Sequence, residues 1–145
     1  MIKRGVKMYG ALIVAHNTLA REMFSVLENI VGKTEGIQCV SVDWNDDQEQ
    51  GINKIRDALS NLISYDGVVI FTDMFGGTPT NISLPFLEKQ KIEIITGVNL
   101  PMLIKFVNLQ TESFKNMALL LTELKDRARQ SIKVPGEIYY QKKNE

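Results

Sequence analysis

His16 is the only histidine in this chain of 145 residues, and it directly follows an apolar run over residues 11–15. Asn17 and Thr18 come next, and a helical pattern begins after them. This order predicts a strand that delivers one imidazole to the turn before a helix. In an open α/β sheet, that edge is where ligands bind and chemistry takes place. A lone histidine is also common as a packing residue, so His16 alone leaves both roles open.

A second strand end supplies a group that would make this imidazole reactive. Residues 67–72 form another apolar run, and Asp73 follows it. A carboxylate that accepts one N–H of an imidazole fixes the tautomer and stabilises the imidazolium, which leaves the other ring nitrogen nucleophilic. We therefore predict that Asp73 orients His16, although an isolated aspartate before a helix also commonly serves as a cap.

The turn after Asp73 has the composition of an anion site. Gly76 and Gly77 allow backbone amides to approach a ligand closely, and Thr78 with Pro79 predicts an N-cap and first residue of a helix. Helix N-termini favour anions, and the Thr78 hydroxyl adds a donor. Together with a nucleophilic histidine and its carboxylate, these are the parts needed to accept a phosphoryl group. The same turn by itself is also what a tight helix start requires.

Other exposed positions around these strand ends are candidates for docking a partner protein. Met74 and Phe75 lie beside Asp73 on the same loop, and the alternative for both is packing under that loop. Asn17 and Asn99 flank two other strand ends and complete the predicted partner-docking set.

Several other chemistries are disfavoured. One histidine and one cysteine without clustered spacing predict no metal site, and no cofactor is expected. The chain lacks a P-loop, a GxGxxG fingerprint after the first strand and a GxSxG elbow. The chain has 17 Lys and Arg residues and 17 Asp and Glu residues, and this balance does not favour nucleic-acid binding.

The expected location of the protein is the cytoplasm. Cys39 is expected to be a core thiol in a reducing compartment, and no apolar run approaches the length of a membrane span.

Strands alternate with helices along the chain, which predicts an α/β fold with a doubly wound, mainly parallel sheet and helices on both faces. The expected strands cover residues 8–15, 37–42, 67–72 and 92–96, with the order 2-1-3-4. Pro85 should bend or shorten the helix that begins at Thr78. Residues 137–140 are a candidate for an extra C-terminal edge strand. We predict a single domain over residues 8–141, an N-terminal lead over 1–7 and a polar tail over 142–145.

The order of ALIVAH, VVIFTDMFGGTPTN and ITGVNLPML strongly resembles the mannose-family enzyme IIA domains of the bacterial phosphoenolpyruvate-dependent sugar phosphotransferase system. The resemblance runs from about residue 8 to about residue 130. It implies that His16 carries the phosphoryl group, that Asp73 hydrogen-bonds its imidazole, and that Thr78 stands beside the phosphate. Gly76 and Gly77 match the glycine pair of the family's loop.

The resemblance also implies partners and leaves alternatives. The donor would be the histidine-containing phosphocarrier protein, the acceptor a histidine of enzyme IIB, and the protein a homodimer in which the C-terminal strand is sometimes exchanged. A membrane would be involved only indirectly, through the permease complex. Asn17 departs from the glycine that usually follows the histidine. The alternatives are a phospho-dependent regulatory module without sugar transport and the phosphoryl-donor subunit of a dihydroxyacetone kinase.

Overall fold

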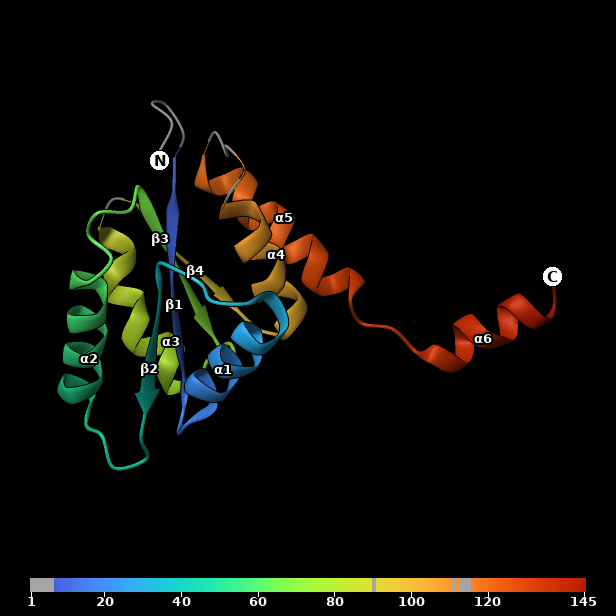
Figure 1. The fold of residues 1–145 in the computed structure, drawn as a ribbon. Helices are drawn as coiled ribbons and strands as arrows, with labels where there is room; N and C mark the ends of the chain where they lie inside the picture. Colours follow the sequence, from blue (N-terminus) through green and yellow to red (C-terminus); the bar gives the residue numbers. More distant parts are fainter. Residues whose placement is uncertain (1–6, 90, 111, 113–115) are drawn as a thin grey trace.

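The computed structural model describes residues 7–89, 91–110, 112 and 116–145. Strands and helices alternate as far as α4, and further helices complete the described chain (Figure 1). In chain order the elements are β1 (Tyr9–His16), α1 (Leu19–Val31), β2 (Ile37–Val42), α2 (Gln48–Ser60), β3 (Gly67–Thr72), α3 (Thr78–Ser83), the 3₁₀ helix η1 (Leu84–Glu88), β4 (Ile92–Thr96), α4 (Leu100–Gln110), α5 (Met117–Gln130) and α6 (Pro135–Lys143).

The four strands form one parallel sheet with the order β2-β1-β3-β4, which confirms the predicted order. Val14 of β1 pairs with Thr72 at the end of β3, while His16 pairs with Val42 at the end of β2. All strands run in the same direction, so their carboxyl ends meet at one edge. That edge brings the residues that follow β1, β2, β3 and β4 together.

Helices cover both faces of the sheet because successive strand residues point to opposite sides. Leu12, Val14 and Ile70 pack with residues of α2, α3 and η1 in one buried cluster. Ile13 and Phe71 belong to the other, which includes residues of α1, α4 and α5 (Figure 1). The β1 and β3 side chains in both layers are almost fully buried, so the two central strands that carry the candidate chemistry are covered on both faces.

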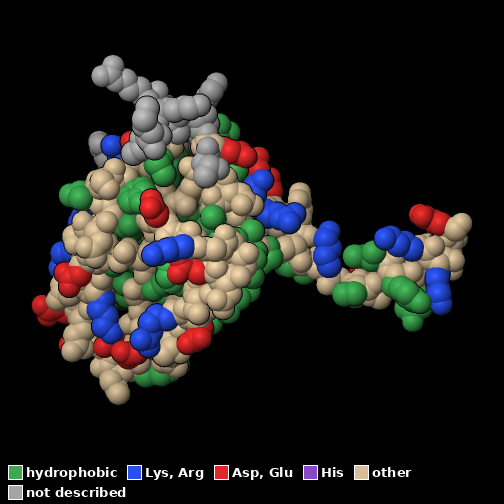
Figure 2. All heavy atoms as spheres, viewed as in Figure 1, with side chains coloured by type: hydrophobic (Ala, Val, Ile, Leu, Met, Phe, Trp, Pro, Cys, Tyr) green, Lys and Arg blue, Asp and Glu red, His purple; other side chains and the backbone are tan. Residues whose placement is uncertain are grey.

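Pro85 shortens the third helix as predicted: α3 ends at Ser83 and the chain continues as the 3₁₀ helix η1. The predicted C-terminal strand is wrong, because residues 137–140 lie in α6. This helix projects away from the body of the protein (Figures 1 and 2). Residues 137–140 have no neighbouring strand to pair with among the described elements, whereas a helix pairs its backbone groups within the segment. Pro135 in its first turn also favours helix initiation.

Lys142 and Lys143, the first residues of the predicted polar tail, are the last residues of α6. Residues 1–6 of the predicted N-terminal lead lie outside the described residues. None of the helices in the described part of the chain is both long and apolar enough to cross a membrane.

Candidate active site

His16 and Asp73 meet at the carboxyl edge of the sheet, where β1 and β3 end side by side. Asp73 Oδ2 accepts a hydrogen bond from the His16 backbone N at 2.9 Å and lies 2.6 Å from His16 Nδ1. The other carboxylate oxygen, Oδ1, accepts from the backbone N of Met74 at 3.0 Å. The carboxylate is therefore fixed on both oxygens, and the imidazole is oriented against it.

This contact assigns separate roles to the two imidazole nitrogens. An ionised carboxylate only accepts hydrogen bonds, so Nδ1 of His16 carries the proton that is shared with Asp73. Nε2 is then the nitrogen with an available lone pair. The His16 side chain is 24% exposed and the Asp73 side chain 12%, so the imidazole can be reached while its partner is largely covered. The arrangement is that of an oriented, accessible nucleophile.

Two further residues form walls around the imidazole. A Cβ atom added to Gly77 would lie 3.2 Å from His16 Cε1 and 3.1 Å from Met74 Cγ, so a side chain at Gly77 would crowd the ring. On another side, the indole of Trp44 lies with its ring centroid 5.5 Å from that of the imidazole, at an interplanar angle of 32°. Trp44 is nevertheless 79% exposed. Because the indole is exposed to solvent and contacts the imidazole, Trp44 belongs to the candidate site and not to the hydrophobic core.

The loop that carries Trp44 is braced by one lysine. Lys54 Nζ on α2 donates to the backbone O of Ser41 at 3.0 Å and to Asp46 Oδ2 at 2.6 Å, and it lies 3.4 Å from Asp43 Oδ2. The hydrogen bond from Lys54 lowers the pKa of Asp46, and the same bond raises the pKa of Lys54. This network holds both ends of the turn at Trp44 and so fixes where the indole projects.

The turn over Gly76 and Gly77 lies where it was predicted, but the helix after it begins one residue earlier than predicted. Gly77 is the N-cap of α3 and Thr78 is its first residue, which corrects the prediction that Thr78 caps the helix. Gly76 has φ +81°, a left-handed conformation that favours glycine. No described residue accepts a hydrogen bond from the backbone amides of Gly76 or Thr78. Gly76 and Thr78 are exposed residues of the loop that follows Asp73.

Two buried threonines support this loop, and the sequence reasoning missed both. Thr80 Oγ1 donates to the backbone O of Met74 at 2.7 Å and lies 2.7 Å from Thr72 Oγ1. A hydroxyl has one proton to donate, so Thr72 is the donor in the second bond. The pair ties the Asp73 loop to the last residue of β3. Threonine at the end of a buried strand, eight residues before another threonine, was the only available signal.

The predicted docking residues divide into two groups. Met74 and Phe75 are 55% and 83% exposed, so they do not pack under the loop. Asn17 is exposed and has φ +52°, and its backbone N donates to the O of Val42 at 2.9 Å. Asparagine adopts this left-handed conformation more readily than most residues, so the turn after the histidine forms without glycine.

Asn99, the remaining predicted docking residue, makes contacts that hold the start of α4. Its side chain is half-buried, and Oδ1 accepts a hydrogen bond from the backbone N of Met102 at 2.9 Å. The backbone O of Asn99 also accepts from Leu103 N at 3.2 Å. These bonds satisfy the first turn of α4 in the manner of an N-cap. Asn99 therefore positions α4 at the edge of the site, and its role in docking stays a prediction.

Neither the described side chains nor their spacing form a metal site. Within residues 7–89, 91–110, 112 and 116–145, no group of three or more His, Cys, Asp and Glu side chains could hold an ion. Cys39 is a half-buried thiol whose Sγ lies 3.6 Å from the backbone O of Ala20. Burial raises the pKa of Cys39 to about 11, so it is not a nucleophile at neutral pH.

Comparison with known proteins agrees with this geometry. The family model for the PTS system fructose IIA component matches residues 10–122. The fructose-specific EIIA component of Bacillus subtilis is 29% identical over 144 residues, covering 94% of this chain and 88% of that protein. The mannose-specific EIIAB component of Escherichia coli is 28% identical over 115 residues; these residues cover 77% of this chain but only 36% of that longer protein.

Solved structures give the same result. The crystal structure of the phosphotransferase system component EIIA from Streptococcus agalactiae matches with a TM-score of 0.77 and 27% identity, covering 90% of this chain and 99% of that one. A shared fold, a matching family model over most of the chain and a histidine–aspartate pair at the sheet edge agree with one another. The chain therefore belongs to the IIA component family of the sugar phosphotransferase system.

Proposed function

We propose that His16 is a phosphoryl carrier: it accepts a phosphoryl group from the histidine-containing phosphocarrier protein and transfers it to a histidine of enzyme IIB for sugar uptake. The observation that carries this proposal is the 2.6 Å contact between His16 Nδ1 and Asp73 Oδ2. It leaves Nε2 as the nucleophile and provides a negative charge for the imidazolium that forms on phosphorylation.

The transfer is an in-line displacement between two imidazoles. The Nε2 lone pair of His16 forms the new N–P bond as the N–P bond of the donor breaks, and the bond pair leaves with the donor nitrogen. The phosphorylated His16 ring then carries positive charge, which Asp73 stabilises through Nδ1–H. The same steps in reverse order deliver the group to the next histidine. Catalysis in such a transfer consists largely of positioning and of stabilising the three phosphoryl oxygens.

The turn after Asp73 supplies donors for those oxygens. The amides of Gly76 and Thr78 donate to none of the described residues, and the Thr78 hydroxyl is exposed beside them. α3 has only six residues, so the contribution comes from individual N–H groups rather than from a long helix dipole. Gly77 keeps the approach to the imidazole open because a Cβ atom there would lie 3.2 Å from His16 Cε1.

The donor and acceptor proteins would bind over the same surface, one after the other. Trp44, Met74 and Phe75 expose apolar side chains on the two loops beside His16. Exposed aromatic and methionine side chains around a reactive group are typical of a protein-binding surface. Asn17, exposed directly after the histidine, lies within the same surface.

We also propose that the protein forms a homodimer through its C-terminal helix. No residue of α6 is buried within the described chain, although Ile138, Tyr139 and Tyr140 are apolar or aromatic. A second copy would cover these side chains. Sedimentation of the parent and of the Ile138→Ser/Tyr139→Ser double variant tests this: the parent should sediment as a dimer and the variant as a monomer. A monomeric parent would refute it.

The phosphoryl-carrier proposal is tested by reconstitution. The protein is incubated with radiolabelled phosphoenolpyruvate, the enzyme that loads the phosphocarrier and the phosphocarrier itself, and acid-labile phosphate is measured. The parent should be labelled and His16→Ala should not, while Asp66→Asn, an exposed aspartate beside Met8 at the opposite edge, should behave as the parent. Equal labelling of His16→Ala would refute the proposal. Labelled protein that transfers phosphate to no enzyme IIB would refute the sugar-uptake role and favour a regulatory one.

A further inference from the structure

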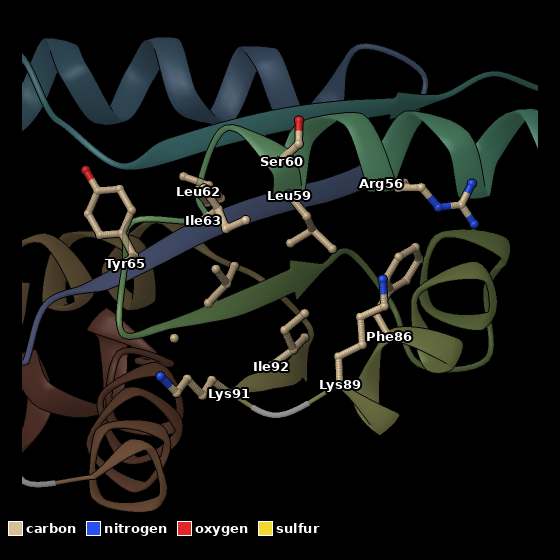
Figure 3. A pocket seen from close by; sticks show the side chains of 12 residues that line it. Arg56, Leu59, Ser60, Leu62, Ile63, Tyr65, Phe86, Lys89, Lys91 and Ile92 are labelled. Atoms are coloured by element: carbon tan, nitrogen blue, oxygen red, sulfur yellow. The ribbon is translucent and has the colours of Figure 1, made fainter.

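A second hollow lies at the opposite edge of the sheet, where the strands begin (Figure 3). It is a cleft of about 390 Å³ between the end of α2 and the segment from η1 to β4. Gly67 and Val68, the first residues of β3, and Ile92, the first of β4, form part of it. His16 and Asp73 lie at the other ends of β1 and β3, so this cleft has no part in phosphoryl transfer.

The floor of the cleft is apolar and its rim exposes further apolar surface. Leu62, Val68 and Phe86 lie in the lining and are 2%, 6% and 3% exposed. Leu59 and Ile92 are half-buried beside them, and Ile63 at the rim is 87% exposed. An exposed isoleucine next to a hollow with a hydrophobic floor is surface that water solvates poorly, and a ligand with an apolar body would cover it.

The walls of the cleft are preformed. The ring of Tyr65 packs so closely on Gly36 that a Cβ atom there would lie 2.5 Å from Tyr65 Cζ, which fixes one wall. On the other side, the backbone O of Lys91 accepts a hydrogen bond from Val68 N at 2.8 Å. Lys91 has φ +76°, an uncommon conformation for a residue with a side chain. Lys91 is therefore held to β3 at the entrance of the cleft.

Three cations line this cleft: Arg56, Lys89 and Lys91. None of the described lining residues is acidic. Lys89 Nζ lies 5.1 Å from the centroid of the Phe86 ring, and Arg56 Nη1 donates to Asn53 Oδ1 at 2.6 Å, which leaves its other N–H groups for a ligand. Figure 3 shows Lys91 at the end of the cleft away from Arg56. Positive charge thus borders the apolar floor at both ends.

We propose that this cleft binds a small organic anion that has an apolar body, such as an aryl or alkyl phosphate or carboxylate. The apolar floor takes the body, and Arg56 with Lys89 binds the anionic group at one end of the cleft. The volume of about 390 Å³ lies in the range of small-molecule sites and is too small for a folded partner. This site is independent of the phosphoryl-carrier proposal, because it shares no residue with the His16 edge.

The experiment uses 1-naphthyl phosphate as the probe, with the full chain and its His16→Ala variant. Binding is followed by isothermal titration and by NMR shifts of Ile63, Tyr65 and Phe86. We expect sub-millimolar binding to both proteins. 1-Naphthol, inorganic phosphate and the cationic 1-naphthylmethylamine should each bind more weakly, because each lacks the anionic group or the apolar body. Arg56→Gln and Lys89→Gln should each weaken binding roughly fivefold, and Lys91→Gln, at the other end of the cleft, should weaken it less.

Lys133→Gln is the matched control, since Lys133 is an exposed lysine outside the cleft, and it should bind as the parent. Equal binding of 1-naphthylmethylamine would overturn the role of the cations. Shifts confined to Trp44 and His16, with loss of binding in His16→Ala, would place the probe at the other edge and overturn the proposal. An absence of binding at millimolar probe would overturn it as well. Phosphoryl uptake by Arg56→Gln should equal that of the parent, so failure of this proposal leaves the carrier function untouched.

Discussion

A single oxygen of Asp73, Oδ2, contacts both the backbone N and the ring Nδ1 of His16, at 2.9 and 2.6 Å. The same oxygen atom therefore holds the backbone of His16 at the end of β1 and orients its imidazole ring. A neutral amide at this position would accept more weakly and would stabilise the cationic ring less.

Asp73→Asn is expected to slow phosphoryl uptake from the phosphocarrier roughly 10²- to 10⁴-fold, because the ring loses both its tautomer restraint and its counter-charge. Initial rates of labelling measure this. Asp66→Asn should retain the parent rate, and thermal unfolding of both variants separates lost chemistry from lost structure. A rate within twofold of the parent would show that Asp73 does not orient His16.

Trp44 is the only tryptophan, so the intrinsic fluorescence of the protein excited at the indole band reports on the His16 site alone. Phosphorylation places charge beside an indole that lies 5.5 Å from the imidazole, and the emission should therefore change in intensity or wavelength. The change should be absent in His16→Ala. Lys54→Met should reduce the change, since Lys54 braces the Trp44 loop, and fluorescence anisotropy should fall in that variant. Identical spectra before and after phosphorylation would contradict the contact.

Thr80→Val should lower the free energy of unfolding by about 1–3 kcal/mol, because the isosteric change leaves the Met74 carbonyl and the Thr72 hydroxyl without their buried partner. Denaturant titration measures the loss. Thr122→Val is the matched control, as Thr122 is exposed on α5 and makes only a bond to its own helix, to Ala118 O. If both variants lose the same stability, the buried network is not what holds the loop.

Asn17→Ala should lower the free energy of unfolding by about 1 kcal/mol, whereas Asn17→Gly should leave it nearly unchanged, because φ is +52° at this residue. Asn61→Ala, at an exposed position with φ −77°, provides the comparison for removing an asparagine from a right-handed conformation. Thermal or denaturant unfolding decides the question. A loss in Asn17→Gly as large as that in Asn17→Ala would mean that the side chain, and not the backbone, stabilises this turn.

Cys39 should make stability depend on pH at the alkaline end. The thiol ionises near 9 in an unfolded chain, whereas burial holds its pKa at about 11 in the folded protein. Between these values the unfolded state loses a proton that the folded state retains, so the free energy of unfolding falls as pH rises from 9 to 11, and the thiol contributes no change below 9. Cys39→Ala should remove that part of the slope. Native protein should also react slowly with a disulfide reagent at pH 8 and rapidly in denaturant.

Much of the fold could be predicted because hydrophobic patterning and topology act together. Four apolar runs alternating with amphipathic segments predict parallel strands, and the order 2-1-3-4 then places the ends of β1 and β3 side by side. The contact between His16 and Asp73 follows from that adjacency. The same strand order places the loop after β2 beside the end of β1. The position of Trp44 near His16 could therefore have been predicted from the sequence, but it was not.

Other features depend on contacts that patterning does not encode. The α6 segment has an apolar run short enough for either a strand or a helix, and its helical form follows from its separation from the sheet. The shared hydrogen bonds of Thr72 and Thr80 require knowledge of how the loop folds over β3. The start of α3 at Thr78, with Gly77 as its cap, differs by one residue from the prediction because Gly77 is held in an extended conformation against the imidazole.

The pairing of Val14 with Thr72 makes the contact between His16 and Asp73 depend on the alignment of β1 and β3. A slip of one residue between β1 and β3 would turn the histidine to the opposite face of the sheet and carry it away from Asp73. Chains that have collapsed with misaligned strands would therefore be unable to take up phosphate even when their helices have formed. The rate at which refolding protein regains phosphoryl uptake would therefore measure how fast these two central strands reach their final alignment.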